Sequence, residues 1–180
     1  MSNIVKRNEG IPGIKTAFIF ACPGQEEEKS GRLVNGQTGK NLDAMLVYLK
    51  AEMPEIFPSV DRYDYRITNS SESVHYMAFD GRTEPSRKEI KSPENLERLA
   101  SDISGYDVII TFGNSAAFAA EEIKGRFPDV RFLYSRHLSF LSLNSGIKTD
   151  IDGNPIQRGA PDSTAKRLEV ATDEILRQLR

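Results

Sequence analysis

The chain has 180 residues, of which 38% are hydrophobic and 28% charged, and its formal net charge is −2. These values are typical of a single globular domain, residues 1–180, and exclude a disordered chain. No apolar run approaches the length of a membrane span, and residues 1–13 lack the apolar core of a signal peptide, so we expect a cytoplasmic protein without membrane contacts. Since the net charge is slightly negative, binding of a polyanion requires a local cluster of basic residues.

The first half of the chain predicts two strands and one helix. Residues 15–21 are apolar and stop at Cys-Pro-Gly, as a buried strand does. Apolar side chains then recur at helical spacing from Leu42 to Met53, with Thr38 placed before them as an N-cap. Residues 64–69 have the pattern of a second strand, and the polar stretch of residues 70–93 predicts a long excursion at the surface.

The second half repeats this alternation. Leu96, Leu99 and Ile103 mark a helix, and residues 106–125 predict a strand, a tight Gly-Asn-Ser turn and an alanine-rich helix. Residues 130–135 predict a fourth strand, and a last helix begins at Pro161-Asp162-Ser163. Such alternation predicts a three-layer α/β sandwich whose central, mostly parallel four-stranded sheet is covered on both faces.

Ligands of such folds bind beyond the carboxyl ends of the strands. Four loops are expected at that edge: residues 22–39, the chain after Asn69, residues 113–115 and residues 136–144. The "GQTGK" stretch is not a nucleotide phosphate loop, because only two residues separate Gly36 from Gly39-Lys40, where that motif needs four. Its glycines otherwise permit turns and a helix start.

Two polar residues at this edge have side chains suited to chemistry on a base. Asn69 ends the second strand, and its amide can pair a donor and an acceptor with the edge of a nucleobase. His137 follows the fourth strand, where an imidazole can donate to an oxygen that gains negative charge. Each also has a structural alternative, since Asn69 can cap a turn and His137 can be an ordinary surface histidine. His75 lies in the excursion and receives no role.

The motifs "PGQEEEKSGRLVNGQTGKNLD", "ITN", "ITFGNSAA" and "HLSFL" occur in an order that resembles the uracil-DNA glycosylase superfamily, most closely its family 4 branch. The resemblance extends from Phe18 to about Leu143. The first motif matches with unbroken spacing at Pro23, Gly24, Glu27, Gly31, Arg32, Gly36, Gly39, Leu42 and Asp43. Agreement over the whole set is more specific than any of its parts.

This resemblance implies a uracil-DNA glycosylase-like fold and an enzyme that binds DNA, flips the target base out and hydrolyses its bond to deoxyribose. It places Asn69 on the base-reading asparagine and His137 on the histidine that stabilises the leaving base. Backbone amides of Gly24 and residues 113–115, helix starts at Thr38 and Ser115, and the basic Arg136, Lys148 and Arg158 are expected near DNA phosphates. Residues expected in the base pocket or on DNA are Cys22, Pro23, Gly24, Gln25, Val34, Asn35, Gly36, Gln37, Gly113, Asn114, Ser115, Ser139, Phe140 and Leu141.

The sequence departs from this family in the residues for a cluster and for the attacking water. Family 4 members carry cysteines for an iron–sulfur cluster, whereas this chain has only Cys22, so we expect no cluster, no metal and no other cofactor. The residue that prepares the water in related enzymes falls at Ala21 or Cys22, and neither replaces a carboxylate. Glu27 or Gln37 is the expected substitute. If neither acts, the domain is a DNA-binding module that does not cut.

Two further departures concern the size of the base pocket. Val34 stands where the family has a phenylalanine that stacks on uracil, and Gly24 stands where classical uracil enzymes have a tyrosine that excludes groups at the 5-position. We therefore hypothesise a bulky pyrimidine substituted at carbon 5, such as glucosylated hydroxymethylcytosine of bacteriophage DNA, and a role in defence against phage. The alternatives are a uracil enzyme of base-excision repair and the non-catalytic module.

Overall fold

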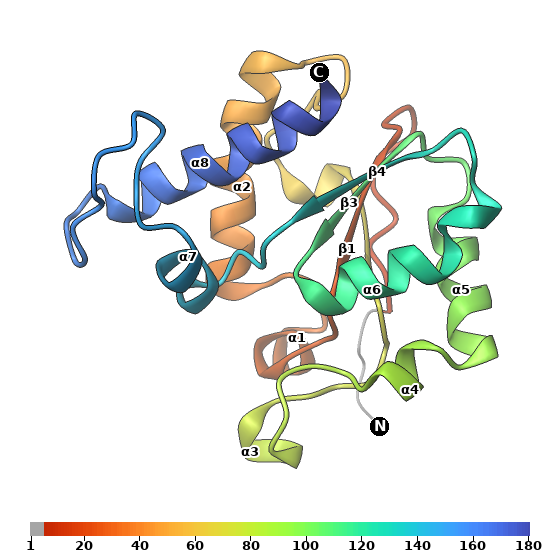
Figure 1. The fold of residues 1–180 in the computed structure, drawn as a ribbon. Helices are drawn as coiled ribbons and strands as arrows, with labels where there is room; N and C mark the ends of the chain where they lie inside the picture. Colours follow the sequence, from red (N-terminus) through yellow and green to blue (C-terminus); the bar gives the residue numbers. More distant parts are fainter. Residues whose placement is uncertain (1–5) are drawn as a thin grey trace.

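The computed structural model describes residues 6–180, and its centre is a four-stranded sheet (Figure 1). Every neighbouring pair is parallel, and the strand order is β2-β1-β3-β4. All residues of β1 and β3 are buried, as expected for central strands covered on both faces. The four predicted strands and their parallel arrangement are confirmed, with bounds β1 Thr16–Phe20, β2 Arg66–Asn69, β3 Val108–Phe112 and β4 Arg131–Ser135.

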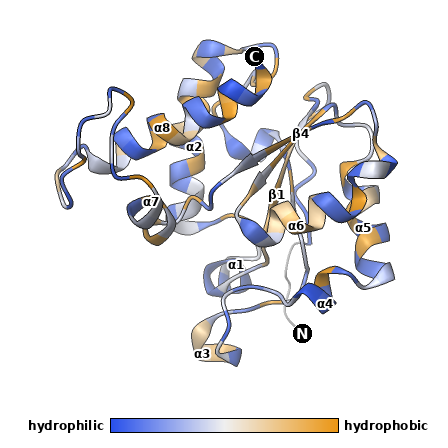
Figure 2. Ribbon diagram, in the orientation of Figure 1, coloured by the Kyte–Doolittle hydropathy of each residue, from blue (hydrophilic) through white to orange (hydrophobic). Residues whose placement is uncertain are grey.

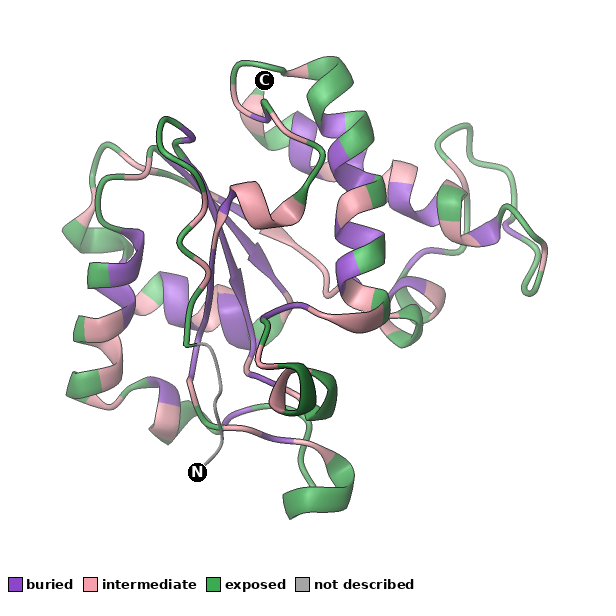
Figure 3. Cartoon of the chain, turned by 180° about the vertical axis from the view of Figure 1, so that it is seen from behind, coloured by how far each residue is buried: buried purple, intermediate pink, exposed green. Residues whose placement is uncertain are grey.

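Helices cover both faces of the sheet (Figures 1 and 3). On one face, α2 Gly36–Glu52 packs with α8 Ser163–Leu179 over the even-numbered residues of β1, Phe18 and Phe20. On the other, α5 Pro93–Ile103 and α6 Asn114–Ile123 cover Ala17 and Ile19. Side chains of a strand point alternately to its two faces, so β1 contributes to both hydrophobic clusters. Figure 2 shows the resulting concentration of hydrophobic residues in the central strands.

Two helix starts differ from those predicted, and one helix was not predicted. Helix α2 begins at Gly36 with Asn35 as N-cap, so Thr38 lies inside its first turn. Helix α6 begins at Asn114, and Gly113 occupies its N-cap with φ 92°. Helix α1, Gln25–Ser30, was not predicted, because none of its residues is buried and no apolar stripe marks it. Three glutamates in its first turn favour a helix there, because their negative charges interact favourably with the partial positive charge at the helix N-terminus.

The long excursion after β2 folds back onto the carboxyl edge of the sheet. It contains two short helices, α3 Met77–Asp80 and α4 Arg87–Ile90. Ser70 N–H donates to the carbonyl of Phe20, Ser71 N–H to that of Ala21, and His75 N–H to that of Pro23, at 2.7–3.1 Å. The excursion is therefore attached along the chain that leaves β1.

The remaining elements are short. Two 3-10 helices, η1 Arg62–Asp64 and η2 Lys124–Arg126, precede β2 and β4. Helix α7, Phe140–Gly146, follows β4 and packs against α8. None of the helices between residues 6 and 180 combines the length and the apolar character needed to cross a membrane.

Candidate active site

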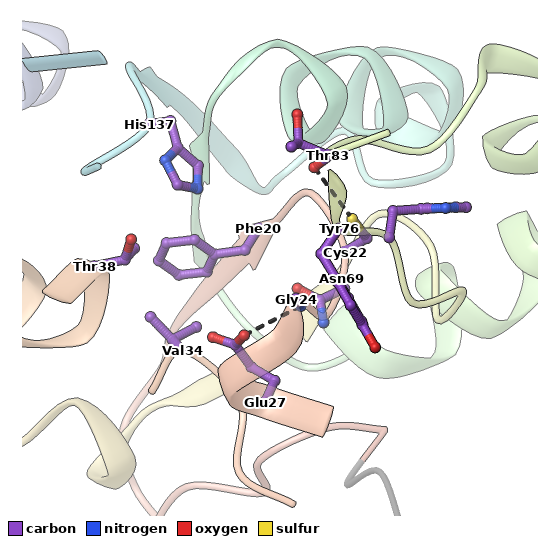
Figure 4. Close-up of a pocket in the computed structure, with 11 residues that line it drawn as sticks. Phe20, Cys22, Gly24, Glu27, Val34, Thr38, Asn69, Tyr76, Thr83 and His137 are labelled. Atoms are coloured by element: carbon purple, nitrogen blue, oxygen red, sulfur yellow. Dashed lines mark hydrogen bonds between the residues drawn. The ribbon is translucent and has the colours of Figure 1, made fainter. Parts of the chain in front are cut away.

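A pocket of about 250 Å³ lies beyond the carboxyl ends of β1 and β2 (Figure 4). It brings together seven residues that the sequence predicts for the site, from three separate loops. This is the edge at which parallel α/β sheets bind ligands. Its lining consists of Phe20, Cys22, Gly24, Glu27, Val34, Thr38, Asn69, His75, Tyr76, Thr83 and His137.

Asn69 is held in the pocket by its backbone while its side chain is free. It is the last residue of β2 and only 2% exposed. Its carbonyl accepts a hydrogen bond from Arg98 Nη2 at 2.8 Å, and Arg98 is in turn fixed by Asp102 at 2.7 Å. Among residues 6–180, the Asn69 side-chain amide makes no hydrogen bond. A buried amide that is positioned but unpartnered suits a ligand that offers both a donor and an acceptor.

The hydrogen bonds of His137 fix which ring nitrogen carries a proton. Ser139 N–H donates to His137 Nδ1 at 3.1 Å, so this nitrogen is an acceptor and the neutral ring carries its proton on Nε2. Burial lowers the pKa of His137, and the nearby charge of Glu84 opposes this to a smaller extent. In Figure 4 the ring points towards Phe20, with a centroid separation of 6.3 Å. His137 therefore offers a neutral N–H donor to the pocket.

Glu27 connects the start of α1 to the start of α2. Its Oε2 accepts from Gly24 N–H and its Oε1 from Asn35 N–H, both at 3.1 Å. Burial raises the pKa of Glu27, and these backbone donors oppose the rise. Both oxygens are thus already engaged, and the geometry favours a bracing role over the activation of water.

Replacing Glu27 by Gln is expected to destabilise the fold by about 1–3 kcal/mol, because the amide nitrogen cannot accept and leaves one backbone N–H without a partner. Chemical unfolding followed by circular dichroism measures this change. Glu26→Gln is the matched control, since Glu26 lies exposed on the same helix and its one ion pair within residues 6–180 is with Lys29, at 3.7 Å. Equal stability of the two variants would contradict the bracing role.

Val34 lines the pocket in a strained backbone conformation. It is the only non-glycine residue with positive φ in the described chain, at 50°, which is costly for a β-branched side chain. Gly39 makes this possible, because a Cβ at that position would lie 2.1 Å from the carbonyl oxygen of Val34. Gly39 of the "GQTGK" stretch therefore allows close packing beside the pocket. This agrees with the alternative that the glycines of this stretch serve the backbone rather than a phosphate.

A second hollow of about 680 Å³ adjoins the first and shares Cys22, Thr83 and His137 with it. It collects Gly113, Asn114, Ser139 and Leu141 from the expected DNA-binding set. Beside it, α7 exposes two apolar side chains, since Leu141 is 81% and Phe140 45% exposed. The complete lining is Ala21, Cys22, Thr83, Glu84, Gly113, Asn114, Arg136, His137, Ser139, Leu141, Ser142, Ser145 and Gly146.

Cys22 stands on the boundary between the two hollows. Burial raises the pKa of its thiol to about 12, with a smaller contribution from the charge of Glu84. Its Sγ donates to the carbonyl of Thr83 at 3.7 Å. Because the thiolate is the reactive form, this geometry favours an inert thiol.

Several expected site residues lie outside both hollows. Gln25 and Gln37 are exposed, and Gln37 Nε2 donates to Asn41 at 3.0 Å, so the geometry gives no support to Gln37 as the residue that prepares water. Of the three basic residues, only Arg136 lines a hollow. The others outside both linings are Pro23, Asn35, Gly36, Ser115, Phe140, Lys148 and Arg158.

Four pocket residues had no assigned role in the sequence analysis. Phe20 supplies an aromatic ring where Val34 does not, and it stacks on Phe112 at 4.8 Å. His75 is 4% exposed, and its Nδ1 lies 2.6 Å from Asp80 Oδ2. The remaining two are Tyr76 and Thr83, whose signal was hidden because their whole segment appeared to be a surface loop.

Comparisons with known proteins leave the family of the chain open. No protein-family model matches it, and no curated protein matches its sequence. Within residues 6–180, no group of three or more His, Cys, Asp or Glu side chains is arranged to hold a metal ion. Any assignment of function therefore depends on the geometry of the site and on the motif resemblance.

Proposed function

We propose that the protein is a DNA glycosylase that hydrolyses the bond between a bulky modified pyrimidine and its deoxyribose. The observation that carries this proposal is that two groups line one pocket: the Asn69 amide, which has no hydrogen-bond partner among residues 6–180, and the neutral N–H donor of His137. Its volume of about 250 Å³ is slightly below the ~300–1,000 Å³ typical of sites for drug-sized ligands. It suits the pyrimidine ring alone, so the proposed group at carbon 5 has to extend out of the pocket past Gly24.

The proposed reaction begins when the target base leaves the DNA stack, which costs a few kcal/mol. Asn69 reads the polar edge of the base. As the glycosidic bond breaks, negative charge develops on the pyrimidine, and the Nε2–H of His137 donates to the oxygen that carries it. One such contact lowers the barrier by ~3 kcal/mol. Water completes the hydrolysis and leaves an abasic site.

The wall at Gly24 supports a substrate with a group at the 5-position. A Cβ added there would lie 3.2 Å from Glu27 Oε2, which is a tight contact, and apart from the chain neighbours of Gly24 no other atom lies within 4 Å of it. The φ of −102° is open to any residue, so the glycine is not required by the backbone. A hydroxymethyl group carrying glucose is one such substituent. Its occurrence in phage DNA gives the proposed enzyme a role in defence.

The second hollow is the proposed binding place for the DNA backbone. The start of α6 at Asn114 presents backbone N–H groups there. Arg136 also lines this hollow, with its Nη2 paired with Glu174 at 3.3 Å. The exposed Phe140 and Leu141 are suited to enter the duplex and fill the space left by the flipped base.

Enlarging Gly24 to Tyr is expected to abolish cutting of DNA with glucosylated hydroxymethylcytosine while sparing any action on smaller pyrimidines, because the ring would occupy the open wall. Alkali-sensitive abasic sites, counted in parallel for the wild type and Gly24→Tyr, measure the change. Gly24→Ala is the control for crowding against Glu27, since its Cβ alone would lie 3.2 Å from Oε2, and it should retain cutting. A Tyr variant that still cuts the glucosylated DNA would contradict the assigned substrate and favour the uracil enzyme.

A further inference from the structure

The proposed hydrolysis needs a group that takes a proton from the attacking water. In related enzymes this group falls at Ala21 or Cys22, and here one has no functional group and the other is a protonated thiol. Glu27 accepts two backbone N–H groups and braces the loop. The motif therefore supplies no side chain that can accept the proton of the attacking water.

Glu84 places a carboxylate beside this position from outside the motif. It belongs to the excursion after β2 and lines the second hollow together with Ala21, Cys22 and His137. The preceding residue, Thr83, lines both hollows. A nucleotide with its base in the first pocket and its phosphates in the second has its glycosidic bond at this boundary.

The structure holds Glu84 at one oxygen only. Ser115 Oγ–H donates to Glu84 Oε2 at 2.6 Å, whereas Oε1 has no hydrogen-bond partner among residues 6–180. The chain on either side is anchored, since Thr83 accepts from the Cys22 thiol at 3.7 Å and Pro85 is buried. Glu84 itself is exposed to water. An oriented carboxylate with one free oxygen is the arrangement that a general base requires.

Other carboxylates of the excursion are occupied elsewhere. Asp80 pairs with His75 and Arg82, and Glu89 faces the same two residues. The other ionisable groups in the second hollow are Cys22, Arg136 and His137. Arg136 Nη2 forms an ion pair with Glu174 at 3.3 Å. Among residues 6–180, Arg136 therefore does not pair with Glu84, and Glu84 Oε1 remains available to accept a proton.

We propose that Glu84 is the general base of the reaction, an inference that depends on the glycosylase function proposed above. The bond between C1′ and the base breaks, and its electron pair leaves with the pyrimidine, whose oxygen accepts from His137. The oxygen of water bonds to C1′, and the water proton passes to Glu84 Oε1. Solvent then removes this proton and protonates the departed base.

Glu84→Gln tests this role with little change in shape, because its amide oxygen still accepts from Ser115. Cutting of DNA with glucosylated hydroxymethylcytosine should fall by about 100- to 10,000-fold, the usual contribution of a general base. Affinity for that DNA and the melting temperature should be retained. Glu55→Gln is the matched control, because Glu55 lines a different hollow at the amino ends of β1 and β3, and its cutting rate should equal that of the wild type.

Glu84→Ala with added formate separates catalysis from structure. A small carboxylate that enters the vacated space should restore part of the cutting rate, whereas structural damage would not respond to it. If Glu84→Gln cuts as fast as an active wild type, the role of Glu84 is wrong and the proposed function still stands. The same conclusion follows if Glu84→Ala loses cutting and formate does not restore it. Wild-type protein that cuts neither glucosylated nor uracil-containing DNA would overturn the proposed function and this inference together.

Discussion

Replacing His137 by Ala is expected to lower the rate of base removal by about 100- to 1,000-fold, the range for loss of one donor to a developing oxyanion. The fold should persist, because His137 lies in a loop after β4 and its hydrogen bond in the described chain is to the N–H of Ser139. Single-turnover cutting of DNA that carries glucosylated hydroxymethylcytosine measures the rate. The thermal melting curve serves as the control for folding.

The pH dependence distinguishes a neutral from a charged donor at His137. Burial lowers the pKa of this residue below its ordinary value of 6.5, and Ser139 N–H occupies the nitrogen that would gain the proton. The ring should therefore remain neutral as pH falls through 6.5, and the wild-type rate should show no rise there. A rate that increases with protonation near pH 6.5 would indicate that the imidazolium is the active form.

Replacing Asn69 by Ala is expected to remove recognition of the base, at a cost of about 1–3 kcal/mol in kcat/KM for one bidentate contact. The fold should be retained, because Arg98 holds the backbone carbonyl of Asn69 and the side-chain amide has no partner in the described chain. Steady-state cutting of the glucosylated DNA measures the effect. Asn69→Asp adds a sharper test, since a carboxylate accepts but does not donate. Wild-type kcat/KM in both variants would remove Asn69 from the site.

The fold was largely predictable because its signals are local. Residues 17–21 form a continuous apolar run, and residues 106–112 are apolar except for Asp107 and Thr111. These two segments contain most of the central strands β1 and β3. Helix α1 escaped prediction because it buries none of its residues, and its glutamates resemble a polar loop. The start of α2 was placed at Thr38 rather than Gly36, since Asn35 caps the helix by backbone geometry without a side-chain hydrogen bond.

The expected site residues that line the pocket either end or follow strands or belong to the first motif. Asn69 closes β2 and His137 follows β4, so parallel strands bring both to one edge. His75 and Glu84 were not predicted, because their place depends on how the excursion folds back. That folding depends on contacts such as His75 N–H to the carbonyl of Pro23, which hydrophobic periodicity does not encode.

The central claim is tested most directly by exposing the purified protein to two DNAs, one containing uracil and one from a phage with glucosylated hydroxymethylcytosine. Alkali-sensitive abasic sites are counted in each, with His137→Ala as the inactive control. We predict sites in the phage DNA alone, and their loss in the variant. Sites in the uracil DNA alone would contradict the modified substrate and indicate a repair enzyme, and sites in neither DNA would contradict catalysis and leave a DNA-binding module.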